Sequence, residues 1–273
     1  MDKYLGLRIR STDETLMALL VGLGADSFEE EEDFFTAYFK EDETDEAARV
    51  EIKSLLDGRK EEYEFFEVEP QNWNEVWEAS FQPVTVGDFC RVRADFHPYE
   101  PGYAYDLVIN PKMAFGTGHH ATTWMMIDEM QKTDFRNKRV FDYGCGTGIL
   151  AILASKLGAH SVDALDIEHE SYLNTVENSE LNQAVNVRAL EGDLSVMGGA
   201  TYDIILANIN RNVLLESADS LKSMLHSGGR LLLSGIRPAD EEVITQAFKL
   251  AGFSLLRRQE KEDWVCILLA SDT

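Results

Sequence analysis

The feature that most constrains the fold is residues 140–148, VFDYGCGTG, where an apolar pair is followed by an acid and then by three alternating glycines. An apolar helical pattern follows directly over residues 149–157 and ends at Gly158, where a C-terminal cap belongs. A strand, a tight glycine loop and a helix in this order predict the opening unit of a nucleotide-binding α/β sheet. Glycine suits such a loop because the backbone must turn sharply and admit a ligand without obstruction by Cβ atoms.

The charge beside this loop narrows the choice of ligand. Asp142 stands two positions before the first glycine, where it would repel the anionic pyrophosphate that dinucleotide loops bind at a helix N-terminus. S-adenosylmethionine has no phosphate and carries a cationic sulfonium beside an ammonium group, so an acid suits it. We therefore expect Asp142, Gly144 and Gly146 to belong to an S-adenosylmethionine site. The motif resembles the first motif of the seven-stranded S-adenosylmethionine-dependent methyltransferases.

A second acid follows at the expected spacing. Residues 161–167, SVDALDI, predict the next strand, and Asp166 lies 18 residues beyond Gly148. In this class of fold an acid about 20 residues past the loop, at the end of the next strand, holds the ribose hydroxyls. The two features together predict a cofactor-binding α/β domain more strongly than the glycine loop alone.

Composition places the chain among folded proteins without a membrane span. Its 273 residues are 44% hydrophobic, and no stretch approaches the roughly 18 consecutive apolar residues that a membrane helix needs. The first residues contain no signal-peptide core, and three scattered cysteines indicate neither a disulfide framework nor a zinc site. We expect a cytoplasmic protein that binds no metal.

The net charge of −24 is concentrated in the first quarter, where residues 1–70 hold 21 acids and 8 bases. Such a surface disfavours direct nucleic-acid binding, which depends on lysine and arginine contacts to phosphate, and favours a basic protein partner. Acidity that only keeps the protein soluble is the alternative. We expect a monomer.

The N-terminal 69 residues predict a separate small domain. Alternation and capping signals give the order β-α-β-β-α-β, which is that of the ferredoxin-like fold. Ser11 and Glu14 predict a capping box at the start of the first helix. We expect this domain, residues 1–69, to recognise a substrate, although a stabilising module without a partner is the alternative. Residues 70–82 predict a linker helix, in which Trp73 and Trp77 are expected to pack as anchors, and residues 83–273 the catalytic domain.

A second glycine-rich stretch precedes the cofactor strand. Residues 115–123, FGTGHHATT, lead into a helix that is predicted to begin near Thr122. We interpret the stretch as a lid or wall of the cofactor site, with Phe115 and Gly118 against the ligand and Thr123 as a cap that also donates its hydroxyl. The paired histidines do not predict a metal site, because adjacent rings point apart and no carboxylate or cysteine stands at ligand spacing.

The strand predicted over residues 202–208 ends in Asn208. Ligands in open α/β sheets lie beyond the carboxyl ends of the strands, so Asn208 should face the transferable methyl group, where its carbonyl oxygen can accept a hydrogen bond from an amine. Alternatively, Asn208 only caps the turn.

Amino-methylating relatives often have Asn-Pro-Pro-Tyr at this place. The replacement by Ile209 and Asn210 disfavours a flipped planar base and is compatible with an aliphatic amine. Asp193 is expected near the adenine.

Residues 115–120, Thr122 and Thr123, the linker tryptophans and residues 142–148 together resemble the methyltransferases that modify large-subunit ribosomal protein eleven. The resemblance covers nearly the whole chain, and its Phe-Gly-Thr-Gly-His stretch is specific to that family. It implies methylation of lysine side chains, with an α-amino group as a further candidate. It also implies a basic ribosomal protein held by the N-terminal domain. The cofactor contacts that it implies are Thr123, Gly144, Asp166 and Asn208.

Two other classes of function remain open from the sequence. The chain could methylate RNA or a small molecule, although the net charge of −24 disfavours RNA. It could also be a non-catalytic protein that senses the cofactor and docks on a ribosomal partner.

Overall fold

The structure is a computed structural model, and it describes residues 4–31, 33–40, 44, 46–68, 82–110, 116 and 118–272. The chain divides into two compact units, residues 1–80 and 81–273. Trp73 and Trp77, and with them most of the predicted linker helix, lie outside the described residues. None of the helices in the described ranges is long and apolar enough to cross a bilayer.

The N-terminal unit contains one four-stranded antiparallel sheet, with strand order β2-β3-β1-β4. Its apolar core includes Leu7 and Ile9 from β1, Phe39 from β3, and Leu16 and Leu56 from the two helices. The elements are β1 (Tyr4–Ile9), α1 (Glu14–Gly22), β2 (Ser27–Glu30), β3 (Phe35–Lys40), α2 (Glu46–Arg59) and β4 (Tyr63–Val68).

The capping box predicted for α1 is wrong. Asp13 is the N-cap, and its carboxylate accepts a hydrogen bond from the amide of Thr15 at 2.8 Å. Ser11 instead accepts from the amide of Asp13 at 3.3 Å. An ionised carboxylate one residue before the helix competes better for the free amides than a hydroxyl three residues before it.

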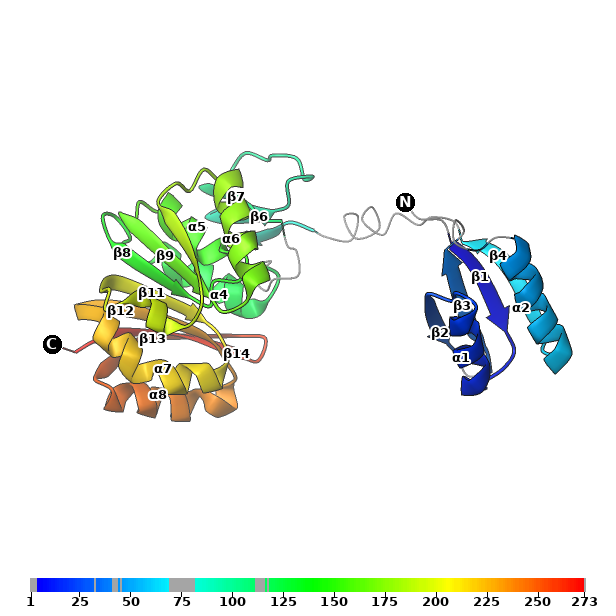
Figure 1. The fold of residues 1–273 in the computed structure, drawn as a ribbon. Coiled ribbons are helices and arrows are strands. Elements are labelled where there is room, and N and C mark those ends of the chain that lie inside the picture. The colour runs from blue at the N-terminus through cyan, green and yellow to red at the C-terminus, as the bar shows by residue number, and fades with distance from the viewer. Residues whose placement is uncertain are drawn as a thin grey trace. The chain divides into compact units, whose positions relative to one another are not determined.

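The C-terminal unit is built on a mixed seven-stranded sheet of order β10-β9-β8-β11-β12-β14-β13, in which β14 runs antiparallel to both its neighbours. Helices cover both faces of this sheet, α4 and α5 on one and α7 and α8 on the other (Figure 1). The elements are α4 (Ala121–Gln131), β8 (Arg139–Tyr143), α5 (Ile149–Lys156), β9 (Ser161–Asp166), α6 (His169–Leu181), β10 (Val187–Glu191), η1 (Leu194–Met197), β11 (Tyr202–Asn208), α7 (Arg211–Met224), β12 (Leu225–Ile236), η2 (Pro238–Asp240), α8 (Glu241–Leu250), β13 (Phe253–Lys261) and β14 (Trp264–Ser271).

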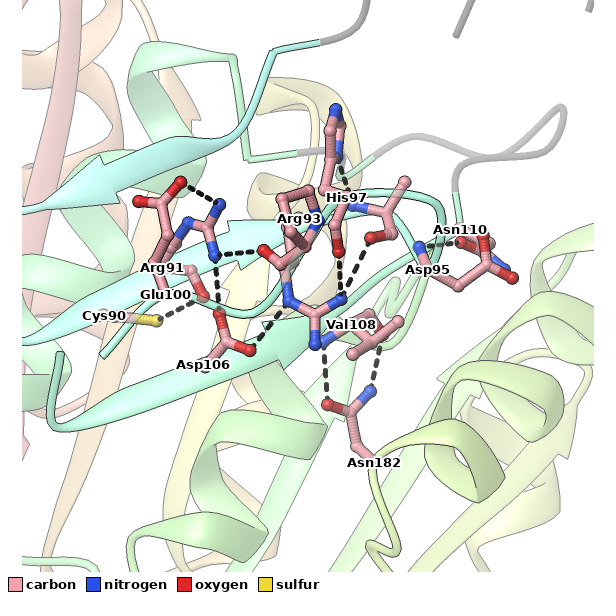
Figure 2. A network of polar contacts seen from close by, with 12 residues as sticks. Cys90, Arg91, Arg93, Asp95, His97, Glu100, Asp106, Val108, Asn110 and Asn182 are labelled. Atoms are coloured by element: carbon pink, nitrogen blue, oxygen red, sulfur yellow. Dashed lines mark hydrogen bonds and ion pairs between the residues drawn. The ribbon is translucent and has the colours of Figure 1, made fainter. Parts of the chain in front are cut away.

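A separate three-stranded sheet of order β5-β6-β7 precedes α4, formed by β5 (Val84–Val86), β6 (Cys90–Arg93) and β7 (Tyr105–Val108). Two arginines of β6 bind Asp106 of β7 (Figure 2). Arg91 is only 2% exposed and also pairs with Glu100 at 3.1 Å, while Arg93 Nε lies 2.8 Å from Asp106. Because the buried Arg91 and the partly buried Arg93 each have a carboxylate and at least one carbonyl as partners, the network holds the parallel pair β6–β7 together.

Candidate active site

The register of the large sheet places three functional positions at one level. Tyr143, the last residue of β8, pairs with Leu165 of β9 on one side and with Ala207 of β11 on the other. The residues that directly follow Tyr143, Leu165 and Ala207 in the chain are Gly144, Asp166 and Asn208. Residues that the sequence separates by up to 64 positions therefore meet at the carboxyl ends of neighbouring parallel strands, where ligands of open α/β sheets bind.

The glycine loop adopts backbone conformations that favour glycine. Gly144, Gly146 and Gly148 have φ values of 72°, 55° and 77°, in the left-handed region that residues with a Cβ rarely adopt. A Cβ on Gly144 would also lie 2.2 Å from the Ile209 side chain. The three glycines are therefore required by the loop itself, as the sequence predicted.

Asp166 lies against this loop. One carboxylate oxygen accepts a hydrogen bond from the amide of Gly146 at 2.8 Å, and the other accepts from the amide of Glu168 at 3.0 Å. These bonds fix the orientation of the carboxylate and leave lone pairs for hydroxyl donors of a ligand. The predicted pairing of the loop with the acid at the end of the next strand is present.

Asp142 takes a different position from the one expected. It is 1% exposed and lies behind the loop, where one oxygen accepts from the amide of Ala151 in α5 at 3.0 Å. Its other oxygen has no hydrogen-bond partner among the described residues. Burial raises the pKa of Asp142 to about 7, against the opposing effect of the Ala151 bond, and the charge of Asp166 raises it further. The side chain points into the layer below α5, so its place at the mouth of the loop is wrong.

Asn208 lies at the end of β11 beside Thr123 of α4. Its side-chain amide nitrogen donates to the Thr123 hydroxyl at 3.4 Å, and Thr123 is fully buried. With the nitrogen turned toward Thr123, the carbonyl oxygen of the carboxamide is the group left for the cavity. Thr123 therefore touches Asn208 and does not cap α4. His120 is the N-cap instead, and its ring nitrogen accepts from the amide of Thr122.

The second glycine-rich stretch contacts the first. The carbonyl of Gly116 accepts a hydrogen bond from the Thr147 hydroxyl at 2.7 Å. Gly118 packs against Val92 instead of joining the cavity wall, since β6 occupies the space beside it. Phe115, which the sequence placed against the ligand, lies outside the described residues.

A cavity of about 850 Å³ opens at this end of the sheet. Its wall includes Gly144, Gly146, Asp166, Asn208 and Asp193, all of which the sequence analysis singled out. Among the described residues that line it none is a lysine or arginine, whereas five are acids, namely Asp166, Glu168, Glu170, Asp193 and Glu216. Such a wall disfavours phosphate and suits a cationic ligand.

Trp264 and Glu216, which were not among the residues predicted from the sequence, also line this cavity. Trp264, at the start of β14, lies edge-on to the His120 ring with centroids 4.8 Å apart, and the Arg237 guanidinium stacks on it at 3.9 Å. Burial lowers the pKa of His120, and the Arg237 charge lowers it further. No local sequence pattern around Trp264 indicates that it lines the cavity. Of residues 115–123, His120 and Thr122 line the cavity.

His119 and His120 do not meet at a metal site. His119 bonds the carbonyl of Gln82 at 2.8 Å, while His120 is engaged with Thr122. The described part of the chain contains no group of three or more histidine, cysteine, aspartate or glutamate side chains placed to hold a metal ion.

A glycine loop, a strand-end acid and a cation-favouring cavity at the carboxyl edge of a mixed α/β sheet define an S-adenosylmethionine-dependent methyltransferase. In agreement, the crystal structure of ribosomal protein L11 methylase from Lactobacillus delbrueckii subsp. bulgaricus is similar with a TM-score of 0.64 and 28% sequence identity, covering 71% of this chain and 100% of that one.

The chain belongs to the family described as "Ribosomal protein L11 methyltransferase", whose family model matches residues 10–272. It is 40% identical to the "Ribosomal protein L11 methyltransferase" of Porphyromonas gingivalis (strain ATCC BAA-308 / W83), covering 98% of this chain and 93% of the relative. Its identity to the protein of the same name from Bacteroides fragilis (strain YCH46) is 37%, over 94% of this chain and 93% of that one. The class of enzyme, the cofactor and the family predicted from the sequence are thereby confirmed.

Proposed function

We propose that this chain transfers methyl groups from S-adenosylmethionine to amino groups of ribosomal protein L11, chiefly those of lysine side chains. Family membership supports the methyl donor and the ribosomal protein substrate. The observation that carries the amine chemistry is the Asn208 carboxamide, which Thr123 holds by its nitrogen so that its oxygen is available to the cavity. A carbonyl oxygen there accepts an N–H of the attacking amine and directs its lone pair.

The proposed roles of the other residues follow from their contacts. Bound S-adenosylmethionine supplies an activated methyl group. Gly144 and Gly146 let the backbone approach it, and Asp166, already fixed by the Gly146 amide, binds the ribose hydroxyls. Asp193 is an acid of the cavity wall, and we propose that it lies near the adenine. Phe115 lies outside the described residues, and its contact with the cofactor remains a proposal from the sequence.

A lysine amine, with an ordinary pKa of about 10.4, must lose a proton before it attacks. His120 is an unsuitable acceptor, because its Nδ1 already accepts from the amide of Thr122 as the helix cap. In our proposal the proton leaves to water, and positioning by Asn208 provides most of the acceleration.

The N-terminal unit is proposed to be a ferredoxin-like recognition domain over residues 1–69, joined by a linker over residues 70–82 to a seven-stranded catalytic domain over residues 83–273. The order of its elements and of its strands agrees with this topology. Its 21 acids against 8 bases within residues 1–70 suit a basic protein and not a nucleic acid. The high net charge also favours a monomer.

The test incubates the purified chain with methyl-labelled S-adenosylmethionine and ribosomal proteins from cells that lack the activity, and locates the label by mass spectrometry. Label on lysine amines of L11 is the expected result. Label on RNA or on a metabolite would overturn the substrate, and the absence of transfer despite tight cofactor binding would overturn the reaction. The Asn208→Ala protein serves as the matched control, because it keeps the rest of the cofactor site.

A further inference from the structure

Three asparagines form a ladder along the buried side of α6 and its C-cap. Asn174, Asn178 and Asn182 follow at four-residue spacing, so they lie one above the other on the helix. Their exposed fractions are 0%, 0% and 5%. Fully buried asparagines are uncommon unless their amide groups are satisfied, so the partners of Asn178 and Asn182 indicate what the ladder does.

Asn182 lies at the end of the ladder away from the glycine loop. It forms hydrogen bonds with one residue of β7. Its side-chain oxygen accepts from the amide of Val108 at 2.9 Å, and its nitrogen donates to the carbonyl of the same residue at 2.6 Å (Figure 2). The nitrogen also donates to the carbonyl of Asn178 at 2.8 Å. This part of the ladder anchors the strand to the helix.

Asn178 joins two different segments. Its side-chain oxygen accepts from the amide of Asn110, just beyond β7, at 3.0 Å. Its nitrogen donates to the carbonyl of Thr147, inside the glycine loop, at 2.9 Å. Only a carboxamide offers one acceptor and one donor in this arrangement. Neither aspartate nor leucine replaces both bonds.

The carbonyl of Gly146, which precedes that of Thr147 in the glycine loop, is also bonded by a residue of α6. The hydroxyl of Thr175, a fully buried residue, donates to the carbonyl of Gly146 at 3.0 Å. Two consecutive carbonyls, of Gly146 and Thr147, are thus turned toward α6. The preceding peptide unit is held from another side, because the amide of Gly146 donates to Asp166, and α6 itself begins at His169, three residues after that acid.

We infer that Asn178 and Thr175 are positioning residues of the cofactor site, which hold the glycine loop at a fixed distance from the ribose-binding carboxylate without touching the cofactor. Glycines adopt many backbone conformations in the absence of external restraints. The side chains of Asn178 and Thr175 fix one backbone conformation of the glycine loop before the ligand binds. The entropy cost of ordering the loop is therefore incurred on folding and not on binding.

The ladder offers a matched pair of variants for the test. Asn178→Leu and Asn182→Leu each remove one hydrogen bond from a backbone amide and one to a backbone carbonyl, and Asn182→Leu loses an additional bond to the carbonyl of Asn178. Both should lower the melting temperature. Only Asn178→Leu releases the glycine loop, so its dissociation constant for S-adenosylmethionine, measured by calorimetry on the full chain well below melting, should rise by about tenfold or more.

The Asn182→Leu protein is expected to keep its affinity within about twofold of the parent. Equal weakening in both variants, or none in either, would overturn the inference, because a purely structural role predicts that affinity follows stability. If Asn178→Leu does not fold, Thr175→Val replaces it: a rise of about fivefold or more in the dissociation constant supports the inference, and an unchanged value overturns it. The measurement is independent of the methyl acceptor, so it stands whether or not L11 is the substrate.

Discussion

Asn208 and Thr123 meet side chain to side chain, with the Asn208 amide nitrogen 3.4 Å from the Thr123 hydroxyl although 85 positions separate them in the sequence. One comes from the end of a central strand and the other from the first turn of α4. The contact decides which end of the carboxamide is available to an amine.

Replacement of Asn208 by alanine should lower turnover far more than it weakens cofactor binding. Loss of an oriented acceptor in the transition state costs about 10²-fold or more in kcat, whereas the ribose and loop contacts of the cofactor are kept. Single-turnover transfer and calorimetry would measure the two quantities. Thr123→Val, which removes only the orienting hydroxyl, should give a smaller loss of the same kind. Equal losses in both quantities for Asn208→Ala would contradict the assigned role.

Replacement of Asp166 by alanine should show the opposite pattern. It removes both the proposed ribose contact and the bond that fixes the Gly146 amide, so the dissociation constant for S-adenosylmethionine should rise by about 100-fold. The rate constant at saturating cofactor should change less. A variant that binds normally but turns over slowly would show that Asp166 acts in chemistry instead.

Gly144→Ala should destabilise the chain and abolish cofactor binding. The residue has φ of 72°, and its added Cβ would overlap the Ile209 side chain. Gly228 is a matched control with φ of 71° and nothing within 4 Å of its added Cβ. Gly228→Ala should therefore cost only the backbone strain, on the order of 1 kcal/mol, and leave binding intact. Equal losses in thermal melting for the two variants would contradict the steric argument.

The burial of Asp142 predicts a pH dependence of stability. Its pKa of about 7 in the folded chain lies above its ordinary value of 3.8, so the folded state holds a proton that the unfolded state releases between these values. Stability from this group is full below pH 4 and declines as pH rises toward 7, by a few kcal/mol. Asp142→Asn removes this contribution.

The melting temperature of the Asp142→Asn variant, relative to the parent, should therefore rise between about pH 4 and pH 7 and then level off. Asp193→Asn is the control, because hydrogen bonds from Ser195 lower the pKa of Asp193, which removes it from that window. A pH-independent difference for Asp142→Asn would show that Asp142 is ionised throughout.

Charge reversal in the N-terminal unit should weaken substrate binding selectively. Glu64 is an exposed residue of β4, and Glu64→Lys should raise the KM for L11 several-fold if that unit docks a basic partner. Glu242→Lys makes the same charge change on α8 of the other unit and should have little effect. Titrations at two salt concentrations should show that only the first effect weakens with ionic strength. Identical behaviour of the two variants would exclude docking through this charge.

Local spacing was sufficient to predict the cofactor loop and its partner acid. Gly144 directly follows β8 and Asp166 is the last residue of β9, and parallel neighbours bring such positions together without any knowledge of side-chain packing. Asn208 could be placed by the same rule, since it too ends a strand.

Other features depend on information that no short segment contains. Asp142 lies on a strand covered on both faces, so alternation does not indicate which way its carboxylate points. Trp264 reaches the cavity only because β14 is inserted antiparallel beside β12. His120 is the N-cap of α4 because its ring accepts from the Thr122 amide. Thr123 lies inside the helix, and its side chain contacts Asn208 instead.

All the carboxylate, lysine or arginine side chains among the described residues of the cavity wall are acids, and this affects the catalytic cycle. Methyl transfer converts the sulfonium of the donor into a neutral thioether, so the spent cofactor no longer carries the positive sulfur. Five carboxylates with no lysine or arginine among the described lining residues attract the charged form more strongly than the neutral one. The same wall that captures the donor therefore disfavours retention of the by-product, and the enzyme is biased toward exchange of spent for fresh cofactor after each transfer.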